Sequence, residues 1–466
     1  MLTDYRNRTF AEIAVGETAS TSRALSATDV EALALASGDV EPLHIATVDG
    51  ASTERTAVQG AASVALLAGL LSRRLPGPGS AIVSTRLNYA GSIRVGDTLT
   101  ATVTARSKDQ ATRRIEFECR CVNQTGEVLI DGMATVTASD ARIAYNNLAT
   151  PELILRRNDG FAKLFQACRG LLPVTCAIVH PCDRDSLLGS IEAAKLGLIV
   201  PVLVGPEAKI RAVAAAEHVD LAPYRIVATE HSHASADQAV AMVRSGEVES
   251  LMKGSLHTDE LMGAVVATAT GLRTDKRISH VFVMDVPAYP RLLLVTDAAV
   301  NITPDLECKA GICQNAIALA HVLGIAEPKV AILSAVETVT PKIPSTVDAA
   351  ALCKMADRGQ ISGGLIDGPL AFDNAISEEA AKVKGIVSPV AGRADILLVP
   401  DLESGNILAK QLQYLAGAES AGIVLGARAP IALTSRADSV RSRLASAALL
   451  KLVARRLRGE PAKSPT

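Results

Sequence analysis

The sequence predicts two domains of different fold class: an α+β domain over residues 1–145 and a larger α/β domain over residues 151–466. A chain of 466 residues is too long for one hydrophobic core. Strand-like runs follow one another in the first part, whereas beyond residue 151 short apolar runs alternate with helical stretches. The polar run 146–151 is the expected linker. We therefore expect an antiparallel sheet in the first domain and a mainly parallel sheet in the second.

In the first domain, two helices precede most of the strands. Ala27–Asp29 is expected to begin a helix that ends near Ser37. A longer, buried helix is expected over Ala61–Arg74, and the Pro and Gly residues of Leu75–Gly79 terminate it. Four strand-rich runs follow, at Ala81–Tyr89, Thr98–Ser107, Arg113–Asn123 and Val128–Ala138. A long helix against a twisted antiparallel sheet is an α+β arrangement.

The second domain alternates short apolar strands with helices. Strands are expected at 175–179, 200–204, 281–285, 291–295, 330–333, 364–367, 396–399 and 422–425. This alternation is typical of a three-layer fold with a parallel sheet, and the length suits two lobes. A last helix is expected over Val440–Leu457. Aromatic residues make up only 3% of the chain and Trp is absent, so aliphatic side chains build the core, as in buried parallel sheets.

Composition excludes several classes of partner. The net charge of −2 predicts no general attraction to nucleic acid or to an anionic membrane. The N-terminus lacks a signal pattern, and the apolar run Leu196–Val204 is too short to span a bilayer. The eight Cys are scattered without a CxxC pair, which favours a cytoplasmic location. His231 and His233 could bind a metal, but no Cys or carboxylate cluster accompanies them, so no metal site is expected.

The segment Ser37–His44 carries a first candidate site. In Ser-Gly-Asp-Val-Glu-Pro-Leu-His, Gly and Pro bracket a turn after a helix, and irregular backbone can aim Asp39 and His44 at one water. Gly60 precedes the buried helix, whose free N–H groups and positive dipole end could hold a thioester oxygen as enolate charge develops. The alternative is a capped loop with a surface acid and an ordinary histidine.

This segment resembles the MaoC-like, (R)-specific enoyl-CoA hydratase family, whose pattern is Ser-Gly-Asp-x-Asn-Pro-x-His. The resemblance covers the first domain and implies a hot-dog fold, with Asp39 and His44 as the hydration pair and Gly60 as the oxyanion donor. Glu41 stands where the family usually has Asn, and Gln59 where His usually precedes the Gly. A non-catalytic acyl-CoA-binding or dimerisation module is therefore the alternative.

The stretch Pro430–Ser439 carries a second candidate site. Ser435, Arg436 and Asp438 follow an apolar run and precede a helix. The Arg fork can bind phosphate, the Ser hydroxyl and nearby N–H groups add donors, and the carboxylate could deprotonate a thiol. Polar residues also follow three other expected strands: Asp297 and Asn301, then Asp367, then Asp401, Gly405 and Asn406. Strand ends of this kind indicate a substrate-binding cleft at a sheet edge.

Most of the second domain resembles the phosphate acetyl/butyryltransferase family. The matching motifs are Lys253-Gly254, Ser279–Val281, Asp297–Asp305, Thr346–Ala350, Met355–Gln360, Asp367–Pro369, Ser388–Gly392, Pro400–Asn406 and Thr434–Asp438. The resemblance implies interconversion of acyl-CoA plus phosphate with acyl phosphate plus CoA, by a homo-oligomer without metal or redox cofactor. It implies that Ser435 and Arg436 bind the phosphoryl and carbonyl oxygens. The acetyl branch has an Asp base six residues beyond the Arg; Ser442 stands there, and Asp438 is the expected substitute.

The expected protein is thus bifunctional, and its partners are small-molecule acyl-CoA, acyl phosphate and phosphate. Whether the acyl group is acetyl or butyryl stays open. Cys308 or Cys313 could carry the acyl group covalently, but neither has a base at a telling spacing. An NAD(P)-dependent dehydrogenase would have a similar layout, but no Gly-x-Gly-x-x-Gly fingerprint opens a βαβ unit. Direct acyl transfer in a ternary complex is the prediction.

Overall fold

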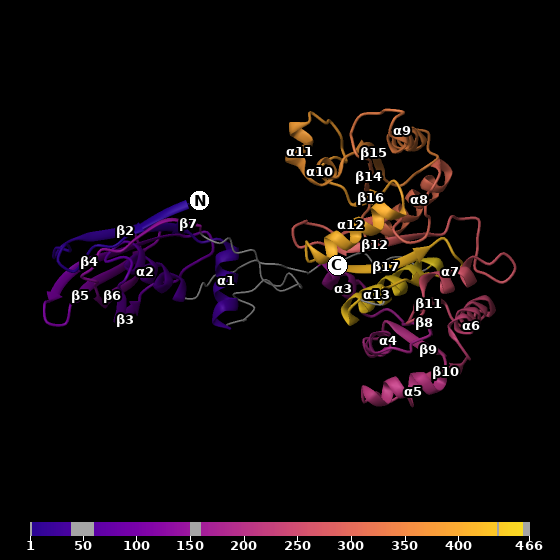
Figure 1. Cartoon of the computed structure of the whole chain (residues 1–466), viewed down its shortest axis with the longest axis horizontal. Helices are drawn as coiled ribbons and strands as arrows, with labels where there is room; N and C mark the ends of the chain where they lie inside the picture. Colours follow the sequence, from indigo (N-terminus) through magenta and orange to yellow (C-terminus); the bar gives the residue numbers. More distant parts are fainter. Residues whose placement is uncertain (1, 39–59, 150–159, 436–437, 460–466) are drawn as a thin grey trace. The chain divides into compact units, whose positions relative to one another are not determined.

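The computed structural model describes residues 2–38, 60–149, 160–435 and 438–459. The chain divides into two compact units, Met1–Leu155 and Arg156–Thr466 (Figure 1). Each unit has a hydrophobic core of its own. Within the described ranges, no helix is long and apolar enough to cross a membrane.

The first unit is an antiparallel sheet with a helix packed on one face. Its strands are β2 (Thr18–Ala24), β3 (Ala81–Tyr89), β4 (Thr98–Asp109), β5 (Arg114–Val122) and β6 (Val128–Thr137), in the order β2-β4-β5-β6-β3. Alternate residues of β4 and β5 are buried, as the two-residue period of a strand requires. Cys119 and Cys121 are among them, in one cluster with the leucines of helix α2 (Ala61–Arg73). The predicted α+β arrangement is confirmed.

Two boundaries in this unit differ from the prediction. Helix α1 (Ala27–Ser37) is capped by Ser26, whose hydroxyl accepts from the Asp29 N–H at 3.1 Å while the Asp29 carboxylate accepts from the Ser26 N–H at 3.0 Å. This reciprocal capping box moves the cap one residue earlier than expected. The run 146–151, expected to be a linker, overlaps strand β7 (Ala144–Ala149), which pairs antiparallel with β1 (Leu2–Arg6). Pairing with β1 satisfies backbone groups that a linker would leave to solvent.

The second unit is built on one mixed sheet, which has eleven strands among the described residues, in the order β10-β9-β8-β11-β18-β17-β12-β13-β16-β14-β15. The strands are β8 (Val174–Val179), β9 (Ile199–Gly205), β10 (Arg225–Ala228), β11 (Ser250–Lys253), β12 (Ser279–Asp285), β13 (Leu293–Thr296), β14 (Lys329–Leu333), β15 (Leu365–Leu370), β16 (Ile396–Leu398), β17 (Glu419–Leu425) and β18 (Ile431–Ala432). Each predicted strand overlaps one of these; β10, β11 and β18 had no prediction.

Helices connect and cover these strands. They are α3 (Gly160–Ala167), α4 (Arg184–Lys195), α5 (Glu207–Ala216), α6 (Ser232–Ser245), α7 (Thr258–Val266), α8 (Leu306–Val322), α9 (Pro344–Asp357), α10 (Phe372–Ile376), α11 (Glu378–Val383), α12 (Leu402–Tyr414) and α13 (Val440–Leu457). The last helix has the predicted bounds. It packs against α3, α4, α8 and β17, so this helix lies in the core of the unit.

The sheet reverses direction at its centre. β12 pairs antiparallel with both β13 and β17, and β17 pairs antiparallel with β18. The strands from β10 to β18 are parallel to one another, and so are those from β13 to β15. Figure 1 shows β12 and β17 between these two parallel sets. Because three antiparallel pairings separate β18 from β13, the two sets point in opposite directions. The two-lobed arrangement expected from the sequence stays a prediction.

Candidate functional site

A closed turn follows β18 and carries the described part of the second predicted site. The Ser435 N–H donates to the Asp438 carboxylate at 2.7 Å, and the Asp438 N–H donates to the Ser435 carbonyl at 3.1 Å. These two bonds tie together the residues on either side of positions 436–437. Arg436 itself lies outside the described residues. Ser435 is exposed, whereas Asp438 is buried.

Two buried cations lie against this turn, and sequence reasoning gave neither a role. Arg443, on α13, is fully buried, and its Nη1 donates to the Thr434 hydroxyl at 2.9 Å. Its Nη2 donates to the Ser435 carbonyl at 3.1 Å. Lys253, at the end of β11, is also buried, and its Nζ lies 3.4 Å from the Thr434 carbonyl. The turn thus lies against the positive charges of Arg443 and Lys253, which suits the binding of an anion.

Asp438 combines burial with nearby charge. Burial raises the pKa of its carboxyl, and the Ser435 N–H and the charges of Arg443 and Lys253 oppose that rise. A carboxylate with a raised pKa is a better acceptor of a thiol proton than an ordinary aspartate. Ser442, at the position where the resemblance to the acetyl branch implies a base, is buried in the first turn of α13, where its N–H donates to Ser439 Oγ at 3.2 Å. Asp438 is therefore better placed than Ser442 to act as a base.

The predicted site residues that follow β13 and β16 lie together. Asp297 is buried and accepts from the N–H groups of Ala299 and Val300 at 3.0 Å each, and from the Asn301 side chain at 2.6 Å. A carboxylate with these donors fixes the loop after β13. Helix α12, which follows β16, packs on that loop: Asn406 Nδ2 donates to the Ala298 carbonyl at 3.2 Å.

Helix α12 reaches this loop through two further predicted residues. Asp401 caps the helix, since its carboxylate accepts from the Ser404 N–H at 2.8 Å. A Cβ at Gly405 would lie 2.8 Å from the Asp297 carbonyl, so only glycine allows this approach. The structure therefore brings the start of α12, with Asp401 and Gly405, beside the Asp297 loop. Both segments follow strands of the same parallel set, β16 and β13.

Asp367 differs from the prediction because its strand does not end before it. The sequence reading ended the strand at 367, yet β15 continues through Gly368 and Pro369 to Leu370. β15 is an edge strand, and an edge strand tolerates Pro because its missing N–H is not needed by a neighbour. Asp367 therefore lies within a strand rather than in a loop past its end.

Because their strands run in opposite directions, the Asp297 loop and the Ser435 turn leave the sheet in opposite directions. One buried residue in the central strands lies near both Asp297 and Leu433. His280 of β12 is fully buried, and burial lowers its pKa to about 4, although the Asp297 charge opposes this. A Cβ at Gly422 would lie 3.0 Å from His280 Nε2 and 2.2 Å from the Leu433 carbonyl. Glycine at 422 thus keeps space for a neutral imidazole beside the strand that leads to Ser435.

The rival nucleophiles are buried thiols. Cys308 is 4% exposed and its Sγ donates to Asn301 Oδ1 at 3.3 Å. Burial raises its pKa, and raises the pKa of Cys313 to about 12. Since the thiolate is the nucleophile, neither environment favours a covalent acyl-enzyme. Among the described residues, no group of three or more His, Cys, Asp or Glu could hold a metal ion.

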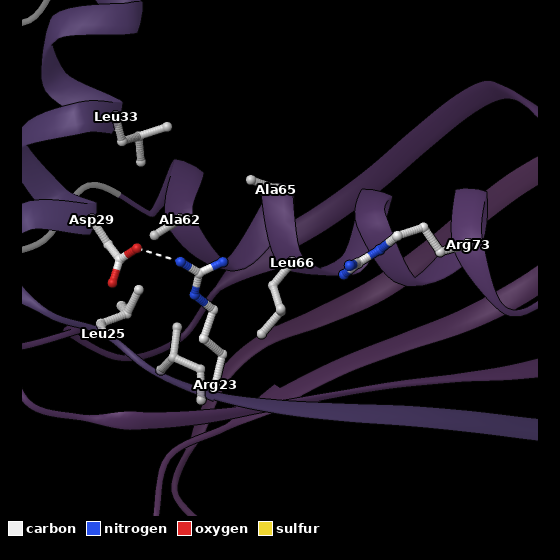
Figure 2. A pocket seen from close by; sticks show the side chains of 9 residues that line it. Arg23, Leu25, Asp29, Leu33, Ala62, Ala65, Leu66 and Arg73 are labelled. Carbon is white, nitrogen blue, oxygen red and sulfur yellow. Dashed lines mark hydrogen bonds and ion pairs between the residues drawn. The ribbon is translucent and has the colours of Figure 1, made fainter. Parts of the chain in front are cut away.

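In the first unit, Gly60 lies at the N-terminus of α2, as predicted, whereas Asp39 and His44 fall outside the described residues. A cavity of about 200 Å³ lies between β2, α1 and α2 (Figure 2). Figure 2 shows the Arg23 guanidinium turned toward Asp29, with which it forms an ion pair, and Leu66 between Arg23 and Arg73. The cavity thus combines apolar walls with two arginines.

Comparison with known proteins identifies the second unit. Residues 228–450 match a family model described as phosphate acetyl/butaryl transferase. A phosphate acetyltransferase of Rhizobium meliloti is 64% identical over 298 residues, which are 64% of this chain and 94% of that protein. A phosphate butyryltransferase of Clostridium beijerinckii is 45% identical over 274 residues, 59% of this chain and 91% of that protein.

Solved structures agree for this unit. A branched-chain phosphotransacylase from Enterococcus faecalis covers 60% of this chain and 99% of its own, at 30% identity and a TM-score of 0.54. The second unit therefore has the fold of a phosphotransacylase. The chain belongs to the phosphate acetyl/butyryltransferase family. An R-hydratase from Pseudomonas aeruginosa matches 33% of this chain at 26% identity, but its TM-score of 0.31 does not establish the activity of the first unit.

Proposed function

We propose that the second unit interconverts acyl-CoA plus phosphate with acyl phosphate plus CoA. The observation that carries the proposal is the Ser435–Asp438 turn, closed over Arg443 and Lys253 in a unit of phosphotransacylase fold. An exposed serine and a buried carboxylate of this turn thus lie beside two buried cations from β11 and α13.

Acyl transfer would proceed by direct attack in a ternary complex. The CoA sulfur bonds to the acyl carbon, the bond from that carbon to the phosphate oxygen breaks, and the thiol proton passes to Asp438. A thiol with an ordinary pKa near ~8.5 needs such a base at neutral pH. Arg436 would bind the leaving phosphate through two parallel hydrogen bonds. The Ser435 N–H already donates to Asp438, so the Ser435 hydroxyl is the group that would donate to the tetrahedral oxyanion.

The acyl chain length separates the two branches of the family. The relatives named above include an acetyltransferase at 64% identity and a butyryltransferase at 45%. We expect phosphate-dependent formation of acyl phosphate from C2, C3 and C4 acyl-CoA, with one chain length preferred. Steady-state kcat/KM for each acyl-CoA measures this, with phosphate omitted as the control. Absence of acyl phosphate with all three substrates would overturn the proposal.

Asp438 as the thiol base predicts a specific pH dependence. Only the ionised carboxylate accepts a proton, so activity should fall as the pH decreases through the pKa of this group. Because burial raises that pKa, the fall should occur at higher pH than for an ordinary aspartate.

Profiles of kcat/KM between about pH 4 and pH 9 would test this in wild type and Asp438→Asn. The variant should lose at least ~100-fold at neutral pH and lack the acidic limb. An unchanged limb in Asp438→Asn would assign the titration to another group.

For the first unit we propose reversible hydration of trans-2-enoyl-CoA to (R)-3-hydroxyacyl-CoA. Asp39 and His44 would activate the water, and Gly60, at the positive end of α2, would stabilise the thioester oxygen. The cavity of about 200 Å³ between β2, α1 and α2, lined by Leu and Ala residues together with Arg23, Asp29 and Arg73, is a candidate place for part of an acyl-CoA. The alternative is a non-catalytic acyl-CoA-binding or dimerisation module.

We also propose that neither reaction uses a metal or redox cofactor, because acyl transfer and hydration exchange no electrons and the residues named supply both acid–base and anion-binding groups. The cytoplasmic location and the homo-oligomeric state stay predictions.

A further inference from the structure

Arg443 is a buried guanidinium whose acceptors among the described residues are neutral oxygens. They are the Thr434 hydroxyl at 2.9 Å, the Ser435 carbonyl at 3.1 Å and the Lys253 carbonyl at 3.4 Å. The side chain is 0% exposed, and its Nε has no hydrogen-bond partner in the described parts of the chain. A buried charge without a carboxylate in direct contact is costly to the fold. Its contacts all converge on the strand ends that deliver Ser435.

Helix α4 leaves space for this side chain. A Cβ at Gly189 would lie 2.8 Å from Arg443 Cδ and 3.0 Å from Arg443 Cβ. Glycine within a helix makes the helix less stable than alanine would, so a packing reason is expected for it. The absence of a side chain at Gly189 therefore leaves the space that the Arg443 side chain occupies between α4 and α13.

The contacts of Arg443 fix which groups of the turn face outward. Arg443 and the Asp438 N–H hold the Ser435 carbonyl, while the Asp438 carboxylate holds the Ser435 N–H. Thr434 is 3% exposed, whereas the next residue, Ser435, is exposed. With its carbonyl and N–H held in this way, the backbone of Ser435, from which the side chain projects, is fixed.

We propose that Arg443 is a positioning residue for the phosphate-binding turn. It anchors the Thr434–Ser435 segment and so sets the backbone geometry of Ser435. The inference rests on the proposed acyl-transfer function and names a group in this site that does not touch substrate. Misplacing a reacting group by about 1 Å costs on the order of 100-fold in rate.

The test compares Arg443→Met with Lys451→Met. Lys451 is a matched control, because it is a buried cation on the same helix whose Nζ donates to a neutral carbonyl, that of Gly197, at 2.8 Å. In acyl phosphate formation, Arg443→Met should raise the KM for phosphate and lower kcat/KM by about 100-fold, with the KM for acyl-CoA near wild type. Lys451→Met should keep wild-type kinetic constants at comparable melting temperature.

Two further variants separate positioning from a purely structural role. Arg443→Lys keeps the positive charge but loses the planar guanidinium with its several donors. It should therefore recover only part of the kcat/KM that Arg443→Met loses. Gly189→Ala keeps Arg443 but adds a methyl group that would contact its side chain, so it should also raise the KM for phosphate. Wild-type constants in a folded Arg443→Met, or equal losses in Arg443→Met and Lys451→Met, would overturn the positioning role. An inactive wild type would overturn the proposed function as well, so the two failures are distinguishable.

Discussion

Replacing Arg436 with lysine should lower acyl transfer by at least ~100-fold, because a point charge cannot replace two parallel hydrogen bonds to phosphate. Both neighbours of positions 436–437 are tied together by the Ser435–Asp438 bonds, so the substitution should leave the turn closed. The measurement is kcat/KM for phosphate in acyl phosphate formation. Arg436→Ala should lose at least as much as Arg436→Lys.

A surface variant controls for the Arg436 substitutions. Arg169, an exposed residue just after α3 and outside the family motifs, is suitable, and Arg169→Lys should behave as wild type. Near-normal turnover in a folded Arg436→Ala variant would remove the phosphate-ligand role.

Replacing Asp39 with asparagine should abolish hydration of trans-2-enoyl-CoA while leaving acyl-CoA binding intact. General acid–base groups contribute about 10²–10⁴-fold, so a loss of at least ~100-fold is expected. The measurement is the absorbance of the enoyl thioester with C4–C8 substrates. Acyl transfer by the same preparation serves as an internal control, because that activity is assigned to the other unit.

Glu41 and Gln59, which depart from the hydratase pattern, are tested in a second part of this experiment. A wild type without hydration would favour the binding-module alternative. A Glu41→Asn, Gln59→His double variant that then gains hydration would identify those two residues as the cause.

The sequence predicts helix or strand correctly where the periodic pattern of apolar residues extends over many positions. The alternating burial of β4 and β5 and the bounds of α13 follow directly from apolar spacing. β10, β11 and β18 have only four, four and two residues and were not predicted. β13 and β16 are also short, but they lie in the longer apolar runs Leu292–Val295 and Ile396–Val399. The reversal at the centre of the sheet also escaped prediction, because a buried strand reads the same whichever way its neighbour runs.

The candidate site was predictable in part. Motif resemblance selected Ser435, Arg436 and Asp438, but spacing does not reveal which charges are buried. Arg443 lies four residues after Ser439 in a helix rich in arginine, where an exposed position is the ordinary expectation. Only tertiary packing shows that it turns inward. A small signal existed in Gly189, a glycine within a predicted helical stretch.

The late position of β18 and α13 in the chain sets a constraint on synthesis. β11 pairs with β18, and α13 packs on α4, so the earliest strands of the second unit gain these neighbours from the last part of the chain. A ribosome that has completed β16 has therefore released β8–β11 without the partners that cover them. The nascent chain keeps apolar surface uncovered until the final helix emerges, and exposed surface of this kind favours aggregation during synthesis.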